Sequence, residues 1–243
     1  MIAMLLSIVI PAYNEAEFIG ALLKRIAAVP TESLGFDKEI IVVDDGSRDR
    51  TGEIARGFSG VKVFTQVPNR GKGKAVQRGI RESTGDYVLV QDADLEYDPN
   101  DYLALLGALG PHADSIYGSR YLGQKRKQRG FTFFPGRHPK QGFGPWAAGQ
   151  LLSLWTWILY RRWITDTLTA YKLYPAEAVR NMRVRTSGFE TDHEITAKLI
   201  RAGYRIVEVP VDYLPRSVAA GKKIKATDGF IALWTLLRFR FAD

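Results

Sequence analysis

The sequence predicts an α/β fold, a mostly parallel and doubly wound sheet with helices on both of its faces. Two observations predict it. Short β-branched runs alternate with segments of helical periodicity through the first hundred of the 243 residues. Several of these runs end directly in acidic or polar residues, which is typical of strands whose carboxyl ends carry a ligand site. Strict alternation favours a parallel sheet, because each crossover helix returns the chain to the same end of the sheet.

The predicted elements follow one another closely along the chain. The predicted strands cover residues 5–10, 39–43, 61–66 and 86–91, and the helices between them cover residues 15–28, 51–57 and 69–83. After Arg120 the sheet pattern stops, and residues 123–144, rich in glycine, proline and basic residues, are predicted to form a long loop. Later elements are helices over residues 145–160, 190–200 and 228–241 and a strand over 204–210.

Three acids follow the fourth predicted strand at alternate positions. Asp92, Asp94 and Glu96 come directly after the apolar run 87–90, and an extended chain places alternate residues on one face. Carboxylates held that close repel one another, and a cation relieves the repulsion. Carboxylate oxygens are the ligands that hard divalent ions prefer. The spacing therefore predicts a divalent metal site.

Two other interpretations of this stretch were weighed. An EF-hand begins with the same alternation, but the chain has Tyr97 where that loop requires Gly and Leu103 where it requires Glu, which excludes it. The second is a solvated acidic turn, with Asp98 capping a helix that begins at Pro99. We expect Asp98 to be this cap, and we assign the other three acids to the metal.

Composition limits the function further. The chain contains no cysteine, which excludes disulfides, thiolate zinc sites and cysteine nucleophiles and favours a reducing cytoplasm. The apolar start has no basic region before it and runs into a motif, so we expect a strand and not a signal peptide. The formal charge is +8, and residues 115–165 contain nine basic residues, no acidic ones and four of the five tryptophans. Anionic membrane surfaces select this mixture, and nucleic acids select it as well.

Glycine-rich segment 69–75 has the composition of a phosphate cradle. It lacks the spacing of a Walker A loop, and no dinucleotide fingerprint is present. Gly71 and Gly73 are therefore expected to allow a tight entry into the helix, with Arg70, Lys72 or Lys74 near a phosphate.

The motifs at the strand ends form an ordered set. They are SIVIPAYNE at 7–15, VVDDGS at 42–47, NRGKG at 69–73, QDADLE at 91–96 and YGSRY at 117–121, followed by DTLTAYK at 166–172, GFETDHEIT at 188–196 and GKKI at 221–224. In this order the chain resembles the family 2 glycosyltransferases of GT-A fold, and it is most similar to the branch of the dolichyl-phosphate mannose and glucose synthases. The resemblance covers almost the whole chain. Any one of the motifs is weak evidence, whereas the ordered set is strong.

The resemblance implies a role for each matching position. The nucleotide-binding residues would be Pro11, Tyr13, Glu15, Asp44, Asp45, Lys72 and Asp92. A Mg²⁺ or Mn²⁺ ion would be held by Asp92, Asp94 and Glu96. The acceptor phosphate would be bound by Arg120, Arg137, Arg216, Lys222 and Lys223. The residues expected in catalysis are Asp94, Arg120, Glu190 and Asp192.

Two positions depart from the family pattern. Many relatives have Gln where this chain has Glu96, and relatives often have Glu where this chain has Ala220. Glu190 and Asp192 carry a structural alternative, because acids in the first turn of a helix are stabilised by its dipole; the functional interpretation is that one of them faces the sugar or acts as a base. We expect the neighbouring His193 to be a surface residue and not a catalyst.

The apolar helix predicted over residues 145–160 is too short to cross a bilayer, which takes about 20 residues. Its narrow polar stripe consists of Gln150, Ser153 and Thr156, and Arg161, Arg162 and Trp163 follow it with the character of a headgroup layer. A helix in the membrane interface and a buried helix that supports the sheet are the two interpretations, and we prefer the first.

The resemblance implies one catalytic domain over residues 1–243. Residues 1–122 would form the nucleotide-sugar half, 123–165 the basic, tryptophan-rich acceptor loop with an interface helix, and 166–243 the acceptor half with the C-terminal helix. The expected reaction is an inverting, metal-dependent transfer of a sugar from a donor of GDP-mannose or UDP-glucose type to a polyprenyl (dolichyl) phosphate. The expected place is the cytoplasmic face of the inner membrane, where the protein would be peripheral. A separate membrane-anchoring subunit is a possible partner.

Two alternatives remain at this point. In the first, the enzyme transfers the sugar to a soluble or polysaccharide hydroxyl, and Glu190 or Asp192 then has to serve as base. In the second, the protein is a non-catalytic lipid or nucleic-acid binder, which leaves the aligned acids without a role. We expect no nucleic acid partner.

Overall fold

The fold is described from a computed structural model, which covers residues 3–128, 130, 132–139, 141–215 and 226–242. Its centre is a seven-stranded sheet in the order β3-β2-β1-β4-β6-β5-β7. The strands are β1 (Met4–Ala12), β2 (Phe36–Asp44), β3 (Val61–Thr65), β4 (Tyr87–Val90), β5 (Ser115–Ser119), β6 (Lys172–Pro175) and β7 (Ile206–Pro210). The α-helices are α1 (Ile19–Ala28), α2 (Thr51–Arg56), α3 (Lys72–Glu82), α4 (Tyr102–Gly107), α5 (Arg120–Lys127), α6 (Phe143–Tyr160), α7 (Ala176–Arg180), α8 (Thr191–Arg201) and α9 (Ala226–Phe241).

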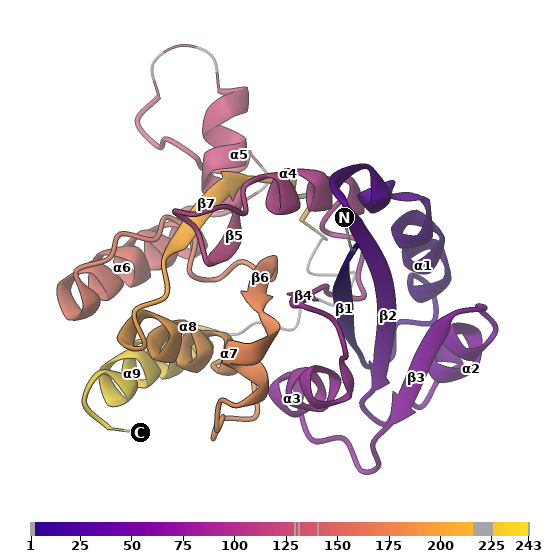
Figure 1. Ribbon diagram of the computed structural model, residues 1–243. Coiled ribbons are helices and arrows are strands. Elements are labelled where there is room, and N and C mark those ends of the chain that lie inside the picture. Colours follow the sequence, from indigo (N-terminus) through magenta and orange to yellow (C-terminus); the bar gives the residue numbers. More distant parts are fainter. Residues whose placement is uncertain (1–2, 129, 131, 140, 216–225, 243) are drawn as a thin grey trace.

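The predicted α/β class is confirmed. β1 pairs in parallel with both β2 and β4, β2 with β3, and β5 with β7. The four predicted strands and three predicted helices of the first hundred residues are all present, although the first helix begins at Ile19 and not at residue 15. Figure 1 shows α3 and α8 on one side of the sheet and α1 and α4 on the other.

The strand predicted over residues 204–210 is confirmed as β7, whereas β6 was not predicted. β6 enters the middle of the sheet and pairs antiparallel with both β4 and β5. Its sequence, Lys-Leu-Tyr-Pro, is too short to show a period and begins with a charged residue, so propensity gave no signal. The sheet therefore joins the first hundred residues to the rest of the chain through a strand that arrives late in the sequence.

The long loop predicted over residues 123–144 is partly wrong. Residues 120–127 form α5, and Ser119 is its N-cap, since its side chain accepts a hydrogen bond from the backbone N–H of Leu122. The glycine and basic residues of this segment led to the prediction of a loop. Residues 143 and 144 already belong to α6.

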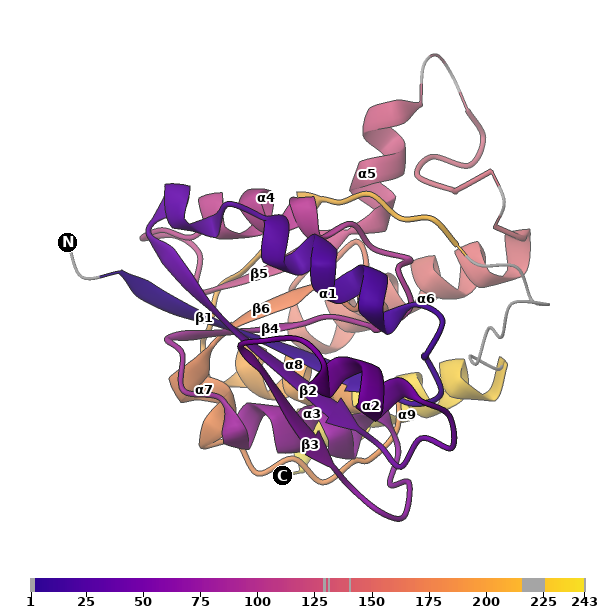
Figure 2. The same cartoon turned by 90° about the vertical axis from the view of Figure 1, so that its right-hand side faces the viewer.

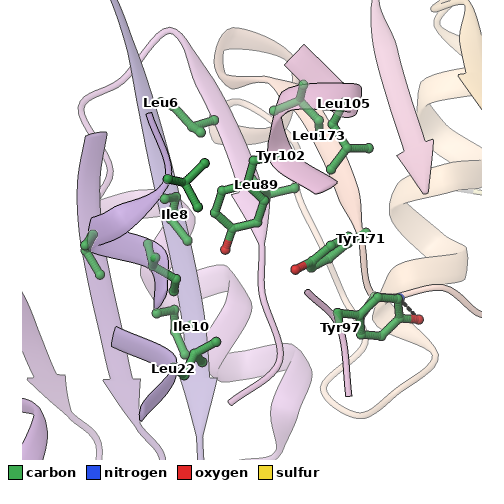
Figure 3. Packing of buried hydrophobic residues seen from close by; sticks show 14 of the residues in the cluster. Leu6, Ile8, Ile10, Leu22, Leu89, Tyr97, Tyr102, Leu105, Tyr171 and Leu173 are labelled. Carbon is green, nitrogen blue, oxygen red and sulfur yellow. Dashed lines mark hydrogen bonds between the residues drawn. The ribbon is translucent and has the colours of Figure 1, made fainter. Parts of the chain in front are cut away.

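The main core lies between the sheet and α1 and α4. Alternate residues of β1, Leu6, Ile8 and Ile10, are fully buried and face Leu22 of α1 and Tyr102 of α4. Figure 3 shows this apolar layer together with three neighbouring tyrosine rings, those of Tyr97, Tyr102 and Tyr171. Because β1 lies between β2 and β4, its burial on both faces fixes the position of the loops that follow all three strands.

A second layer is formed by α6, α8 and α9, which pack against one another beyond β5 and β7. Trp155 of α6 donates to the carbonyl of Leu233, and Tyr160 donates to that of Leu236, both on α9. No helix among the described parts of the chain is long and apolar enough to cross a bilayer.

Candidate active site

The loops after β1 and β2 are tied together by side chain to backbone hydrogen bonds. Asn14, which has a left-handed backbone (φ 53°), accepts from the N–H of Arg48 at 2.8 Å, and its own N–H donates to the Ser47 hydroxyl at 3.0 Å. The N–H of Glu15 donates to the hydroxyl of Thr51 at 2.8 Å. This pairing brings the predicted nucleotide residues Pro11, Tyr13, Glu15 and Asp44 to one edge of the sheet.

Two neighbouring acids end β2 and differ in their partners. Asp44 accepts from the N–H of Ser47 at 2.9 Å. Asp45 is 3% exposed, and its carboxylate accepts from the Gln66 amide and from the backbone N–H groups of Arg70 and Gly71 at 2.6–2.8 Å. Asp45 therefore fixes the entry to α3.

The entry to α3 has the tight geometry that its glycines predict. Gly71 has φ 90°, and a Cβ on Gly73 would lie 2.0 Å from the Thr191 hydroxyl of α8. Lys72 lies between these glycines, and its ammonium group reaches the Asp92 carboxylate at 2.7 Å and lies above the ring of Phe189. Burial alone would lower the pKa of Lys72, but the negative charges of Asp92 and Asp192 outweigh it and raise that pKa. A cation thus stands at the centre of the site, between the end of β4 and the start of α8.

The three acids after β4 are not brought together as predicted. The N–H of Glu96 donates to Asp94, while the Glu96 carboxylate accepts from the Tyr213 hydroxyl at 2.6 Å. The described segments contain no group of three or more His, Asp or Glu side chains that could hold a metal ion. Alternation on an extended chain would have aligned the three acids, but Leu95 has a left-handed backbone (φ 58°) that turns the chain between them.

Gln91 positions this segment; it belongs to the motif at residues 91–96, but no role was predicted for it. Its side chain is fully buried, its carbonyl oxygen accepts from the hydroxyls of Tyr102 and Tyr171 at 2.7 Å, and its amide donates to the carbonyl of Asp92 at 2.8 Å. A buried amide with all these partners holds the chain of Asp92 in one place.

Arg120 begins α5 and is held by Asp166. Its Nε and Nη2 donate to the two carboxylate oxygens at 2.7 and 2.8 Å, and its backbone N–H donates to the same group at 3.0 Å. The guanidinium lies 5.0 Å from the ring centre of Tyr213. No described residue accepts from its Nη1, and Arg120 lines a small pocket with Gln124, His138, Gln141, Trp146 and Tyr213. One edge of the guanidinium is thus fixed, and Nη1 has no hydrogen-bond partner among the described residues.

Other residues predicted at the acceptor phosphate are only partly placed. Arg137 donates to the carbonyl of Gln141 at 3.3 Å and stacks on the ring of Phe134. Its neighbours Gly136, His138 and Gln141 line the pocket that Arg120 also lines. Arg216, Lys222 and Lys223 lie outside the described residues.

The two predicted acids at the start of α8, Glu190 and Asp192, have different surroundings. Glu190 accepts from the N–H groups of Ser187 and Gly188, so it stabilises the turn before the helix. The Asp192 carboxylate receives no hydrogen bond from any described residue, and its charge raises the pKa of Lys72. Of the two candidates for a base, Asp192 is the one that faces the central cation.

His193 is not a surface residue as predicted. It is 3% exposed, neither ring nitrogen has a hydrogen-bond partner in the described structure, and burial together with the charge of Lys172 lowers its pKa to about 3. Lys172, fully buried on β6, donates to the carbonyl of Thr167 at 3.1 Å, and burial lowers its pKa as well. The charge of Lys172 comes from β6, a strand that the sequence did not predict, and the helix that carries His193 packs against α9.

The model of a protein family described as "Glycosyl transferase family 2" matches residues 7–143 of the chain. The chain belongs to this family. It is 33% identical over 214 residues to a dolichol-phosphate mannosyltransferase of Pyrococcus furiosus, covering 86% of this chain and 56% of the relative. It is 28% identical over 229 residues to an undecaprenyl-phosphate mannosyltransferase of Micrococcus luteus, covering 88% of this chain and 85% of the relative. The chain thus spans little more than half the length of the archaeal relative.

A solved structure of similar fold is glucosyl-3-phosphoglycerate synthase from Mycobacterium tuberculosis, in complex with Mn²⁺, uridine diphosphate and phosphoglyceric acid. The TM-score is 0.69 at 22% sequence identity, over 99% of this chain and 80% of that one. The protein is therefore a glycosyltransferase with the GT-A fold that the resemblance implied.

In this glycosyltransferase, α6 has its polar side inward. Ser153 and Thr156 are fully buried, and Ser153 donates to the carbonyls of Gly149 and Thr165. The outward face is apolar and carries Leu151, Leu154, Trp157 and Ile158, continued by Trp163. Trp155 packs against α9, where its indole N–H donates to the carbonyl of Leu233. Helix α9 repeats the pattern, with Thr235 buried and Phe230, Ile231, Trp234 and Phe241 exposed.

Proposed function

We propose that this glycosyltransferase transfers a sugar from a nucleotide-sugar to the phosphate of a polyprenol at a membrane surface. The observation that carries the proposal is the placement of Arg120: its guanidinium is held by Asp166 through one edge, and Arg120 lines a small pocket. A guanidinium edge is a preferred ligand of phosphate. The names of the two mannosyltransferase relatives point to the same class of acceptor.

The donor would lie across the carboxyl ends of β1, β2 and β4. Asp44 and Glu15 line the edge where hydrogen bonds to a base or ribose are expected, and Lys72 stands where a diphosphate can pair with its charge. The sugar would then extend toward Asp192 at the start of α8. Whether the donor is of GDP-mannose or UDP-glucose type is set by the shape of this pocket.

A divalent ion, Mg²⁺ or Mn²⁺, fits the donor set. Asp92 and Asp94 offer hard carboxylate oxygens, and the pairing of Asp92 with Lys72 shows that this acidic segment is neutralised by a cation. These two residues would hold the ion, and Glu96, bonded to Tyr213, would stabilise the segment. The bound ion neutralises the charge that develops on the departing diphosphate.

The chemical step needs little from a base. A phosphate monoester loses its second proton near pH 6, so an acceptor oxygen is already anionic. That oxygen forms a bond to the anomeric carbon, the bond from this carbon to the diphosphate breaks, and the electron pair leaves with the diphosphate, which gives inversion. Arg120 would orient the acceptor phosphate, and Lys72 would pair with the departing charge.

The membrane contact would be made by α6 and α9 together. Both helices bury their hydroxyl side chains and expose aromatic and aliphatic ones, the reverse of helices that face water. Figure 2 shows both helices on the side of the molecule toward which the parallel strands run, opposite the N-terminus. A lipid acceptor would thus reach Arg120 from the surface on which the protein lies, at the cytoplasmic face. In α5, Arg126 and Lys127 pair with Asp212 at 3.7 and 2.7 Å, and Lys125 would add attraction to anionic lipid of about 1 kcal/mol.

A soluble hydroxyl acceptor is the second candidate, because Asp192 keeps a carboxylate without a hydrogen bond from the described residues and could act as base. The test incubates the protein and Mn²⁺ with radiolabelled GDP-mannose or UDP-glucose, a polyprenyl phosphate and a mixture of soluble acceptors. Label in the organic phase is the expected result. Label that stays in an aqueous sugar product supports the second candidate and contradicts the proposal.

A further inference from the structure

The segment after β7 passes between the donor side and the acceptor side of the site. The N–H of Val211 donates to the carbonyl of Ser119, the residue before Arg120. Three residues on, the N–H of Leu214 donates to the carbonyl of Glu96 at 2.8 Å, and Tyr213 forms a short bridge with Tyr97. One stretch of backbone is therefore attached to both sides of the site.

The Tyr213 side chain makes the same connection. Its hydroxyl donates to the Glu96 carboxylate at 2.6 Å. Its ring lies 5.0 Å from the Arg120 guanidinium and 5.1 Å from the ring of Tyr97. Burial and the neighbouring Glu96 charge raise the pKa of Tyr213, so the hydroxyl stays protonated and remains a donor near neutral pH.

The two contacts restrict Arg120 in different directions. Asp166 holds one edge of the guanidinium in its own plane through two hydrogen bonds. The ring of Tyr213 attracts the cation to its face and limits movement out of that plane. Because the Tyr213 hydroxyl is hydrogen-bonded to Glu96, Tyr213 links the position of Arg120 to the segment that carries Asp92 and Asp94.

We propose that Tyr213 is a positioning residue, which sets the place of Arg120 relative to the Asp92–Asp94 segment and so aligns the acceptor phosphate with the donor. This inference rests on the proposed function. The ring and the hydroxyl have separate tasks: the ring supports phosphate binding by Arg120, and the hydroxyl keeps the two sides in register. Misplacement of a reacting group by about 1 Å can cost on the order of 100-fold in rate.

Two variants of Tyr213 separate these tasks. Tyr213→Phe keeps the ring and loses the bond to Glu96, so we expect kcat to fall about 10-fold or more, with little change in the affinity for a short prenyl phosphate. Tyr213→Leu loses the ring as well and should also weaken prenyl phosphate binding, by about 3- to 10-fold for one cation–π contact. Tyr204→Phe, a half-buried tyrosine remote from Arg120, is the matched control and should change neither quantity.

The bond itself is tested with its partner. Glu96→Leu should lower kcat as much as Tyr213→Phe does, the double variant should be no worse than either, and Glu96→Gln, whose amide oxygen can still accept, should lose less. Additive losses in the double variant would mean that the two residues act independently, which would overturn the proposal. Thermal denaturation of each variant shows whether a loss of activity comes from a loss of stability. Equal kcat in wild type and Tyr213→Phe would overturn it as well.

Calorimetric titration with the prenyl phosphate distinguishes a failure of the proposed function from a failure of the role proposed for Tyr213. A wild type that binds this phosphate without transferring sugar to it contradicts the proposed function alone, and the Tyr213→Leu titration still tests the ring. A wild type that binds no prenyl phosphate contradicts both.

Discussion

The donor side and the acceptor side of the site are built in different ways. On the donor side, buried carboxylates and amides fix the backbone, as Asp45 fixes the entry to α3 and Gln91 fixes Asp92. On the acceptor side, a single ion pair between Arg120 and Asp166 lies beside helices that expose tryptophan and leucine. The difference indicates that the donor side is preformed, whereas the acceptor side, under the proposed function, would be completed by the membrane surface.

The largest effect is expected from the donor side. Asp94→Ala should lower turnover by 100-fold or more, on the order of several kcal/mol of transition-state stabilisation from a metal ion, while circular dichroism and the melting temperature stay close to those of the parent. Asp37→Ala, at an exposed acid at the start of β2, is the control for the loss of charge. Normal turnover of the Asp94 variant would remove this residue from the metal site.

A second prediction concerns the surface of α6 and α9. Replacing Trp157 and Trp234 by Ser should weaken binding to vesicles of anionic lipid by about 100-fold, since burial of each aromatic side chain contributes roughly 1.5 kcal/mol or more. The loss should be the same at low and high salt, because apolar burial is not screened. Leu34→Ser with Val67→Ser, two exposed apolar residues outside α6 and α9, should leave vesicle binding unchanged in a flotation assay. If both pairs act alike, the surface is not a membrane contact.

A third prediction concerns the ion pair of the acceptor side. Arg120→Met alone would leave Asp166 buried without its partner, so it is combined with Asp166→Asn. The pair of changes should weaken acceptor binding by about 10- to 100-fold, as expected for the loss of charge-assisted contacts to phosphate, with donor affinity nearly unchanged. Arg205→Met with Asp114→Asn removes a similar bidentate pair at the surface and serves as control. An equal fall in donor affinity would place Arg120 on the donor side.

The smallest effect is one of pH on stability. The pKa of His193 is lowered to about 3, below its usual value of about 6.5 in the unfolded chain. The stabilisation from its neutral, buried state is therefore complete above pH 6.5 and is lost as the pH falls, by about 1.4 kcal/mol per unit. On the donor side, Glu39 has a pKa of about 2, so the stability it contributes is lost only below about pH 4.3.

Chemical denaturation at pH 7, 6 and 5 measures this difference. His193→Phe, which removes the two unpaired ring nitrogens, should flatten the fall in unfolding free energy between pH 6.5 and 5. Glu39→Gln should lower stability by a similar amount at pH 7 and pH 5 and leave the slope as it is. A slope in the His193 variant equal to that of the parent would contradict the assignment.

The sequence predicted the donor side better than the acceptor side for a physical reason. β2 and β4 contain uninterrupted apolar runs, IIVV in β2 and YVLV in β4, and the motifs that follow them at Asp44 and Asp92 resemble a known family. β6 is four residues long and includes Lys172, so its burial depends on tertiary contacts that no local pattern carries. The burial of His193 also depends on tertiary contacts, since its helix α8 packs against α9.

The prediction of the site residues from the sequence has the same limit, because it also depends on tertiary contacts. The alternation of Asp92, Asp94 and Glu96 is correct as a pattern, but it assumes an extended chain, and the left-handed turn at Leu95 sends Glu96 toward Tyr213. The polar stripe of α6 was also found from the sequence, whereas its inward direction, which makes the outer face apolar, could be known only from the packing on α9.

The most direct test of the account compares a polyprenyl phosphate with the corresponding polyprenol as acceptor. The two lipids share the same chain, so they partition alike into the vesicles and differ in the group that Arg120 would bind. Initial rates are measured with labelled nucleotide-sugar and Mn²⁺ for the wild type and for the Arg120→Met, Asp166→Asn protein. The account predicts label in the lipid phase with the phosphate alone, at a rate that falls by about 10- to 100-fold in the variant. Equal transfer to the alcohol, or a rate that the variant leaves unchanged, would contradict it.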